Sequence, residues 1–300
     1  MPGTSLRGPC LAETMDRRRF LARAGGVLGA AALLPRDLEL ITRSAESRVA
    51  NHESLSRIGV QLYTVRRAMQ ESVEQTLEQV ARIGYKEVEF AGYFGRPAKD
   101  IRALLDANGL TAPSAHSADL PSIRDRFGQV LEDATIIGHS YVVCASLPRS
   151  EQSADGYKRV AAEFNQAGAL AAQSGIRLGY HNHDGEFQPL GDTNGYDILL
   201  AECDPKVVTM QLDLFWTVKA GRDPLAYFAK YPGRFASVHV KDMAADGAMV
   251  DVGAGQLPFA RYFAQSGQAG IQHYFVEHDS PADPMASIAA SHKYLSALKY

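Results

Sequence analysis

The feature that most constrains the fold of this sequence is an alternation of short apolar runs with segments of helical periodicity. The alternation starts at Ile58 and repeats eight times before the C-terminus. Short apolar runs predict buried strands, and apolar residues three or four positions apart predict helices. Strands separated by helices pair in parallel, and eight such units close into a barrel. We therefore predict a single-domain α/β protein, a (β/α)8 TIM barrel.

The predicted strands are Ile58–Tyr63, Glu87–Ala91, Leu110–Ala115, Ser140–Cys144, Ile176–Tyr180, Val207–Leu212, Phe235–Val240 and Ile271–Val276. The predicted helices are Val73–Ile83, Ile101–Ala107, Ile123–Ile137, Tyr157–Gln173, Tyr196–Glu202, Pro224–Lys230, Phe259–Gln265 and Met285–Leu298. An open, doubly wound sheet is the main alternative, but the first predicted strand is not followed by the glycine-rich phosphate loop typical of that fold. Three glycines within Asp246–Gly255 predict a mobile loop.

The first 50 residues differ from the rest of the chain. Two arginines, Arg17 and Arg18, lie in a basic stretch before an apolar, alanine- and glycine-rich run from Ala22 to Leu34. This order is typical of an export signal, and the apolar run is too short to span a bilayer. The arginine pair resembles a twin-arginine signal. We expect residues 1–50 to be an export signal and linker, residues 51–300 to be the barrel, and the mature protein to be periplasmic or secreted, without a membrane attachment.

Charge and cysteine content exclude several classes of protein. The net charge of −3 and the pI of about 6.3 do not indicate nucleic acid as a partner. Of the three cysteines, Cys10 lies in the N-terminal segment, and Cys144 and Cys203 end apolar segments. No C-x-x-C motif is present, so we expect buried thiols rather than a disulfide framework.

Four predicted strands end in residues that bind metals in other proteins. His181 and His183 follow the fifth strand, Asp213 follows the sixth, His239 lies near the end of the seventh, and Glu277 follows the eighth. Parallel barrels gather their catalytic groups at the C-terminal edge of the strands, so these side chains are expected to converge. A set of oxygen and nitrogen ligands without a thiolate suits one divalent ion, namely Mn²⁺, Co²⁺, Zn²⁺ or Mg²⁺.

The chain resembles the xylose isomerase-like barrel family, often called sugar phosphate isomerase/epimerase. The resemblance rests on Gly59-Val-Gln-Leu-Tyr-Thr-Val-Arg66, Val88-Glu-Phe-Ala-Gly92, Tyr180-His-Asn-His-Asp184, Gln211-Leu-Asp-Leu-Phe-Trp216, His239-Val-Lys-Asp242 and Val276-Glu-His-Asp279. In that family Glu, Asp, His and Glu from strands five to eight hold the metal. The resemblance places the last three ligands at Asp213, His239 and Glu277.

The fifth strand departs from the family pattern, because Tyr180-His-Asn-His183 stands where many relatives have Glu. His181 can take the ligand position directly, and this is the assignment we prefer. Glu186 can instead reach in from the following loop, with His183 binding substrate. Residues two apart on a strand share a face, so His181 and His183 point to the same side, and the pattern does not choose between the two assignments.

Family isomerases and epimerases use two metal-bound carboxylates as acid and base, with the metal stabilising an enediolate. Here Glu277 can fill one role, and the opposite role needs Glu186, His183 or His181. If none of these fills it, the resemblance implies one-base chemistry such as β-elimination or aldose–ketose isomerisation. Lys241 shares a strand face with His239 and either stabilises developing negative charge on the substrate or pairs with a carboxylate.

Other residues are candidates for contact with a sugar. They are His116, Glu89, Trp216, Gln61 and Tyr63, with a helix cap, an ion pair or core packing as the ordinary alternative for each. We also expect Asp279 to orient a neighbouring side chain rather than to bind metal.

We predict a divalent-metal-dependent isomerase/epimerase of an unphosphorylated sugar or keto-sugar derivative. No basic cluster marks a phosphate site, and an exported enzyme meets few sugar phosphates. The alternatives are a metal-dependent lyase or dehydratase acting on a keto-sugar or inositol derivative, and a carbohydrate-binding barrel without turnover. A small-molecule carbohydrate is the only partner predicted, and a homo-oligomer is left open.

Overall fold

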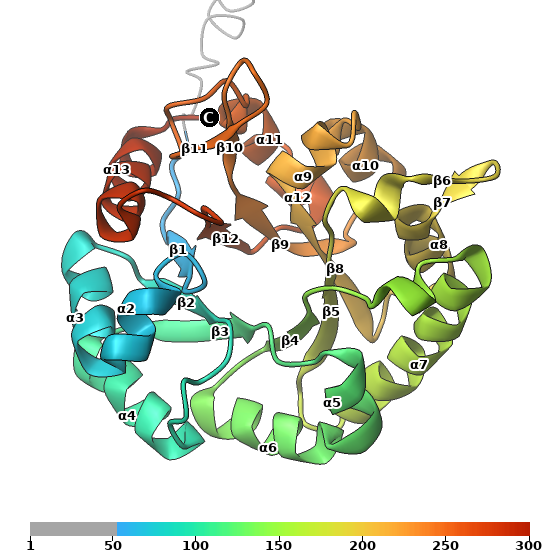
Figure 1. Cartoon of the computed structure of the whole chain (residues 1–300), viewed down its shortest axis with the longest axis horizontal. Helices are drawn as coiled ribbons and strands as arrows, with labels where there is room; N and C mark the ends of the chain where they lie inside the picture. Colours follow the sequence, from blue (N-terminus) through green and yellow to red (C-terminus); the bar gives the residue numbers. More distant parts are fainter. Residues whose placement is uncertain (1–52) are drawn as a thin grey trace, which may run out of the picture. The chain divides into compact units, whose positions relative to one another are not determined.

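The apolar runs of the sequence form the wall of a closed barrel. The computed structural model describes residues 53–300, in which eight parallel strands pair in the order β1-β2-β3-β4-β5-β8-β9-β12 and close through β1 and β12 (Figure 1). The barrel strands are β1 Gly59–Gln61, β2 Glu87–Phe90, β3 Thr111–Ala115, β4 Tyr141–Cys144, β5 Arg177–His181, β8 Val208–Asp213, β9 Phe235–Val240 and β12 His273–Val276. The predicted (β/α)8 barrel is therefore confirmed.

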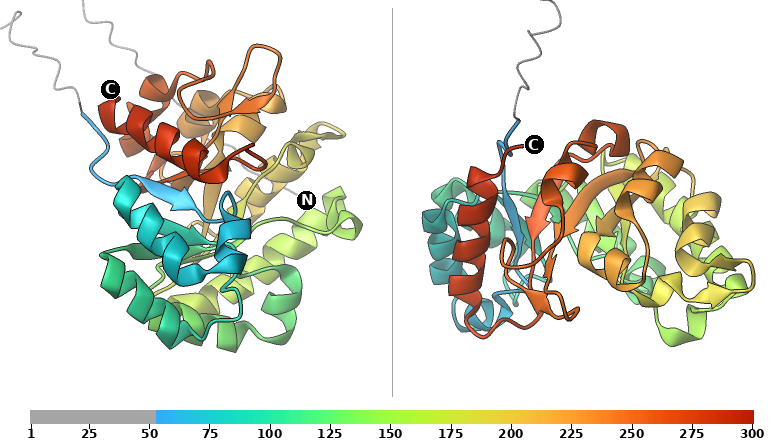
Figure 2. Two further views of the ribbon diagram at one scale, coloured as in Figure 1. Left: turned by 60° about the vertical axis from the view of Figure 1, so that its left-hand side comes forward. Right: turned by 90° about the horizontal axis from the view of Figure 1, so that it is seen from above.

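Helices cover the outside of the barrel, and the last helix lies beside the first strand (Figure 2). Their bounds are α2 Arg66–Glu71, α3 Val73–Ile83, α4 Ala98–Asn108, α5 Leu120–Asp125, α6 Phe127–Ile137, α7 Ala154–Ala172, α8 Gly195–Glu202, α9 Leu214–Lys219, α10 Pro224–Lys230, α11 Phe259–Phe263, α12 Ser266–Ala269 and α13 Pro284–Ala297. In this part of the chain, no helix is long and apolar enough to cross a membrane. The predicted export signal lies outside the described residues.

One of the predicted helices is wrong in its continuity, and another in its end. The helix predicted over Ile123–Ile137 is two helices, α5 and α6, because Arg126 between them has the non-helical angles φ −148° and ψ 27°. The first of the two begins early because the Asp119 side chain caps it and Pro121 fits its first turn. The helix predicted over Phe259–Gln265 likewise ends at Phe263, before the short helix α12.

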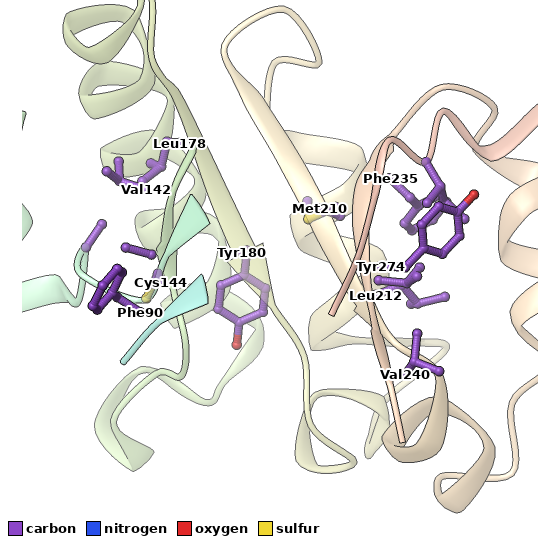
Figure 3. Packing of buried hydrophobic residues seen from close by; sticks show 14 of the residues in the cluster. Phe90, Val142, Cys144, Leu178, Tyr180, Met210, Leu212, Phe235, Val240 and Tyr274 are labelled. Atoms are coloured by element: carbon purple, nitrogen blue, oxygen red, sulfur yellow. The ribbon is translucent and has the colours of Figure 1, made fainter. Parts of the chain in front are cut away.

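The apolar core lies between the strands and the helices, while the inside of the barrel is polar. Val142 of β4 pairs in register with Leu178 of β5, and both belong to the buried core (Figure 3). On β8 the outward side chains include Met210 and Leu212, whereas Gln211 between them bonds across the barrel. Because strand side chains alternate between faces, each strand contributes apolar residues to the core and polar ones to the interior.

The region predicted as a mobile loop is fastened in place. It contains β11 (Met249–Val250), which pairs with β10 (Asp242–Met243) just before the loop. Elsewhere in the chain, a second hairpin joins β6 (Pro189–Leu190) to β7 (Thr193–Asn194). The Asp242 carboxylate accepts hydrogen bonds from the backbone N–H groups of Met243, Gly253, Gly255 and Leu257. One buried carboxylate thus orders the segment that the glycine content alone marked as flexible.

The two cysteines of the described residues are free and buried, as predicted. Burial raises the pKa of the Cys144 thiol, and likewise that of Cys203, to about 12. Both are therefore uncharged thiols that pack in the core rather than reactive groups.

Candidate metal centre

A cavity of about 440 Å³ opens at the C-terminal end of the barrel strands. Its size lies within the range of small-molecule binding sites. The wall is built by residues that follow seven of the eight strands, namely Tyr63, Ala91, His116, Ala145, Ser146, His181, His183, Lys241, Glu277, Asp279 and Ser280. Of the predicted site residues, the structure thus brings His116, His181, His183, Lys241, Glu277 and Tyr63 to one cavity.

The side chains of Asp213, His239 and Glu277 meet at the floor of this cavity. One potential ligand atom from each lies within 4.8 Å of the others, and all three residues are buried. His239 Nδ1 is 2.7 Å from Glu277 Oε2 and 4.0 Å from Asp213 Oδ2. Three ligand atoms at this spacing form a group that can hold a metal ion.

Glu89 fixes the orientation of His239 from the side opposite to Glu277. Its Oε2 atom lies 2.5 Å from His239 Nε2. Burial favours the neutral acid, but His116 and His239 outweigh it and lower the pKa of Glu89 to about 2. Glu89 is therefore ionised, so His239 Nε2 must be the donor. A carboxylate that holds one nitrogen of a histidine in this way directs the other nitrogen at a metal.

In the metal-free protein His239 bridges two carboxylates. Burial opposes its charge, but Glu277 and Glu89 outweigh that effect and raise the pKa of His239 to about 10. The imidazole consequently carries a proton on Nδ1 as well, and a metal that binds Nδ1 must replace this proton.

Lys241 is the cation that balances the carboxylates of the centre. Its Nζ lies 3.1 Å from Asp213 Oδ2, 2.8 Å from Glu277 Oε2 and 2.7 Å from Asp279 Oδ1, and the residue is 1% exposed. Burial opposes the ammonium charge, but the three carboxylates, Asp213 foremost, raise the pKa of Lys241 above its usual range. Asp279 therefore orients a neighbouring side chain, as expected, and that side chain is Lys241.

Two buried atoms at the centre fit a metal better than they fit the metal-free protein. His181 Nδ1 has no hydrogen-bond partner among residues 53–300, and Asp213 Oδ2 has none besides the ammonium of Lys241 at 3.1 Å. Burial, assisted by the neighbouring His239, lowers the pKa of His181 well below its usual value, so this imidazole is neutral and keeps a lone pair for a ligand. A buried polar atom without a partner is costly, and coordination of a cation would satisfy His181 Nδ1 and use the remaining lone pair of Asp213 Oδ2. The residues present therefore fit a divalent ion.

Glu186 is turned away from the cavity. Its Oε1 accepts a hydrogen bond of 2.5 Å from the Tyr180 hydroxyl, and its Oε2 accepts one of 3.0 Å from the backbone N–H of His183. Tyr180 points outward into the core beside Phe164, which places Glu186 behind the strand. His181, whose Nε2 is 3.8 Å from Asp213 Oδ2, therefore stands at the strand-five position in place of Glu186.

Three of the predicted sugar-contacting residues do not line the cavity. Glu89 and Gln61 are 0% exposed, and they hydrogen-bond each other below the cavity floor. Trp216 lies at the side, with its ring 5.7 Å from that of His183 and 5.8 Å from Lys241 Nζ. Glu89 thus supports His239 instead of contacting a sugar hydroxyl. In the sequence, the one sign of its interior position is its two-residue spacing from Glu87 and Ala91, because residues two apart on a strand share a face.

Comparison with known proteins agrees with this architecture. Residues 77–298 match the model of the xylose isomerase-like TIM barrel family. Inosose dehydratase of Clostridium beijerinckii is 25% identical over 193 residues, which are 58% of this chain and 64% of that protein. The corresponding enzyme of Geobacillus thermodenitrificans is 25% identical over 266 residues, or 76% of this chain and 88% of that protein. The first match thus spans less than two thirds of its relative.

Among solved structures, a sugar phosphate isomerase/epimerase from Parabacteroides distasonis superposes with a TM-score of 0.71 at 26% identity. The superposition covers 81% of this chain and 98% of that one. The family model alone spans well over half of the sequence. The closed eight-stranded barrel and the cavity at its C-terminal end are what this fold provides. This chain belongs to the xylose isomerase-like TIM barrel family.

Proposed function

We propose that the protein is a divalent-metal-dependent lyase that removes water from an unphosphorylated cyclic keto-polyol, such as a keto-sugar or a keto-inositol. The observation that carries this proposal is the position of Glu186. With Glu186 behind the strand and His181 at its place, Glu277 is the one carboxylate that both belongs to the candidate ligand set and lines the cavity. A single carboxylate suits chemistry that needs one base.

The dehydration requires three events at the substrate. The C–H bond next to the carbonyl breaks, its electron pair forms a C=C bond, and the C–O bond on the next carbon breaks with loss of hydroxide. Glu277 is placed to accept the proton, and His183, whose ring lines the same cavity, is placed to protonate the departing hydroxide to water. A bound divalent ion would polarise the carbonyl and make the adjacent C–H bond more acidic.

Lys241 holds Glu277 in the ionised form that a base requires. Burial raises the pKa of Glu277, but Lys241 and His239 outweigh it and lower that pKa below its usual range. The ammonium also lies at the cavity wall, where it can stabilise negative charge that develops on a substrate oxygen.

Within the described part of the chain, the cavity lacks a free basic side chain that could bind a phosphate group, which favours an unphosphorylated substrate. Among residues 53–300, Lys241 is the only lysine or arginine in the wall of this cavity, and its ammonium is already bound to three carboxylates. A phosphate dianion would meet Glu277 and Asp279, and the described wall holds no lysine or arginine free of carboxylates to balance it. The predicted export, which also separates the enzyme from sugar phosphates, is part of this proposal. The similarity to inosose dehydratases supports the same substrate class.

Isomerisation or epimerisation is the second candidate. It is favoured by His183, which lines the cavity after the end of β5, while Glu277 lines it after the end of β12, so that the two can act on different sides of one ring. The similarity to the isomerase/epimerase from Parabacteroides distasonis points in the same direction. In this case the carbon that loses a proton regains one, and no water is released.

The test is product analysis in D₂O after loading the purified protein with Mn²⁺ or Co²⁺. A product lighter by one water supports the lyase, whereas deuterium in a product of unchanged composition supports the isomerase or epimerase. Glu277→Gln should abolish either reaction, and the matched variant Glu186→Gln, which alters a buried carboxylate outside the cavity, should keep most of it. If metal-loaded protein shows neither reaction with any keto-polyol, the lyase and isomerase proposals fail, and the carbohydrate-binding barrel becomes the explanation.

A further inference from the structure

A second hollow adjoins the cavity on the side of β3 and β4. Its volume is about 280 Å³, and it shares His116 and Ala145 with the first cavity. The remaining lining residues are Gly92, Tyr93, Ser117, Asp119, Ser122, Arg126, Val130, Asp133 and Val143. Because the two spaces share these wall residues, they lie side by side, with His116 and Ala145 between them.

His116 forms the partition between the two spaces and is held rigidly. Its Nε2 lies 2.7 Å from Gln211 Oε1, and its ring stacks on His239 with centroids 5.2 Å apart and planes 8° apart. The partition is therefore a ring held in a fixed position by Gln211 and His239.

The second hollow carries unused groups that suit hydroxyl recognition. The buried Ser117 Oγ has no hydrogen-bond partner within residues 53–300. Arg126 is exposed and forms no ion pair in the described part of the chain, although Asp119 and Asp133 line the same space. Asp119 uses Oδ1 to cap α5, which leaves Oδ2 as an acceptor. The hollow thus offers donors and acceptors of both kinds.

The charge of the hollow argues against an anionic ligand. Two carboxylates, Asp119 and Asp133, face one guanidinium, Arg126, so the formal sum is −1. Neutral hydroxyl groups can bind to both signs at once, whereas a phosphate or carboxylate would be repelled by the pair of aspartates.

We propose that the second hollow is a subsite for a further hydroxylated ring that is joined to the reacting ring, so that the substrate is a keto-disaccharide or a similar glycoside. This inference rests on the proposed function, because it takes the first cavity to hold the reacting keto ring. The reacting ring then lies over Glu277, the linkage passes His116, and the second ring binds Ser117 and Arg126.

The test compares one-ring and two-ring probes. The one-ring probes are keto-glucose and inosose, and the two-ring probe is the keto derivative of maltose oxidised in one ring. We expect the wild-type protein to prefer the two-ring probe in kcat/KM and, by calorimetry on the metal-loaded protein, in affinity. Arg126→Ala should weaken binding of the two-ring probe by about tenfold or more, as expected for loss of a hydrogen bond to a charged group. The affinity for the one-ring probes should stay within about twofold of the wild type.

Ser117→Ala is the second test variant and Arg124→Ala the matched control. Arg124 is also exposed and lies two residues away, but its guanidinium binds Glu163 and Glu151 outside the hollow. Equal binding of one-ring and two-ring probes by the wild type, or equal losses for both in Arg126→Ala, would overturn the subsite. Binding decides this even if no probe reacts, whereas the absence of turnover with every probe contradicts the proposed function alone.

Discussion

Replacement of Glu89 by Gln is the most direct test of how the candidate metal centre is built. Glu89 Oε1 accepts hydrogen bonds from Ser114 Oγ and Gln211 Nε2, and Oε2 accepts them from Gln61 Nε2 and His239 Nε2. A glutamine keeps the volume but replaces one oxygen by an NH₂ group. If its oxygen keeps the first pair of donors, its NH₂ group must face the second pair.

The expected loss follows from that geometry. The new amide donates to His239 Nε2, which pushes the remaining imidazole proton to Nδ1, the nitrogen that faces Asp213 and Glu277. Loss of such an orienting carboxylate typically weakens metal binding by about 10- to 100-fold, or about 1.4 to 2.7 kcal/mol. The donor left facing Gln61 Nε2 should lower the free energy of unfolding by about 1 to 3 kcal/mol.

The assay is competition for Mn²⁺ or Co²⁺ with a chelator of known affinity, combined with urea unfolding of the metal-free protein. Glu87→Gln is the matched control, since Glu87 lies on the same strand, is 2% exposed and binds His273 Nδ1 at 2.8 Å at the other end of the barrel. It should lower stability without changing metal affinity.

Equal metal affinity for Glu89→Gln and the wild type would refute the role given to Glu89. Equal losses of affinity in Glu89→Gln and Glu87→Gln would also refute it, because the effect would then reflect general destabilisation of the barrel.

Four further predictions concern the centre and its surroundings. Lys241→Met removes the ammonium that competes for Asp213 and Glu277, so it should tighten Mn²⁺ binding by about tenfold or more and lower the melting temperature of the metal-free protein; unchanged metal affinity would contradict this. Mn²⁺ binding near neutral pH should release a proton, because His239 has a pKa of about 10 when metal-free, and an indicator dye in weak buffer measures it. Burial lowers the pKa of His139 from 6.5 to about 4, so on acidification the unfolded chain binds a proton at His139 before the folded protein does. The contribution of His139 to stability should be complete above pH 6.5 and fall by about 3 kcal/mol towards pH 4, and urea unfolding of His139→Gln should lack this pH dependence. Asp242→Asn places an NH₂ group among four backbone donors, so it should cost about 1 to 3 kcal/mol in urea unfolding and speed hydrogen exchange at Gly253 and Gly255, and unaltered exchange there would contradict the fastening role.

The sequence alone was sufficient to predict the barrel and the three residues Asp213, His239 and Glu277 that meet at the cavity. Strand and helix periods are local properties, so the alternation predicted every barrel strand, and the position of Asp213, His239 and Glu277 at strand ends predicted their convergence. Alternation on a strand also placed His181 and His183 on one side, and both line the cavity. The break at Arg126 was missed because helical periodicity continues across a single non-helical residue.

Only the tertiary structure decided what the neighbouring residues do. The direction of Glu186 depends on a turn after the strand and on the Tyr180 hydroxyl, which no periodicity encodes. The pairing of Glu89 with His239 joins residues 150 positions apart, and the hollow beside His116 is formed by separate loops. Local sequence determines which face a strand residue occupies, whereas closure of the barrel determines which groups meet inside it.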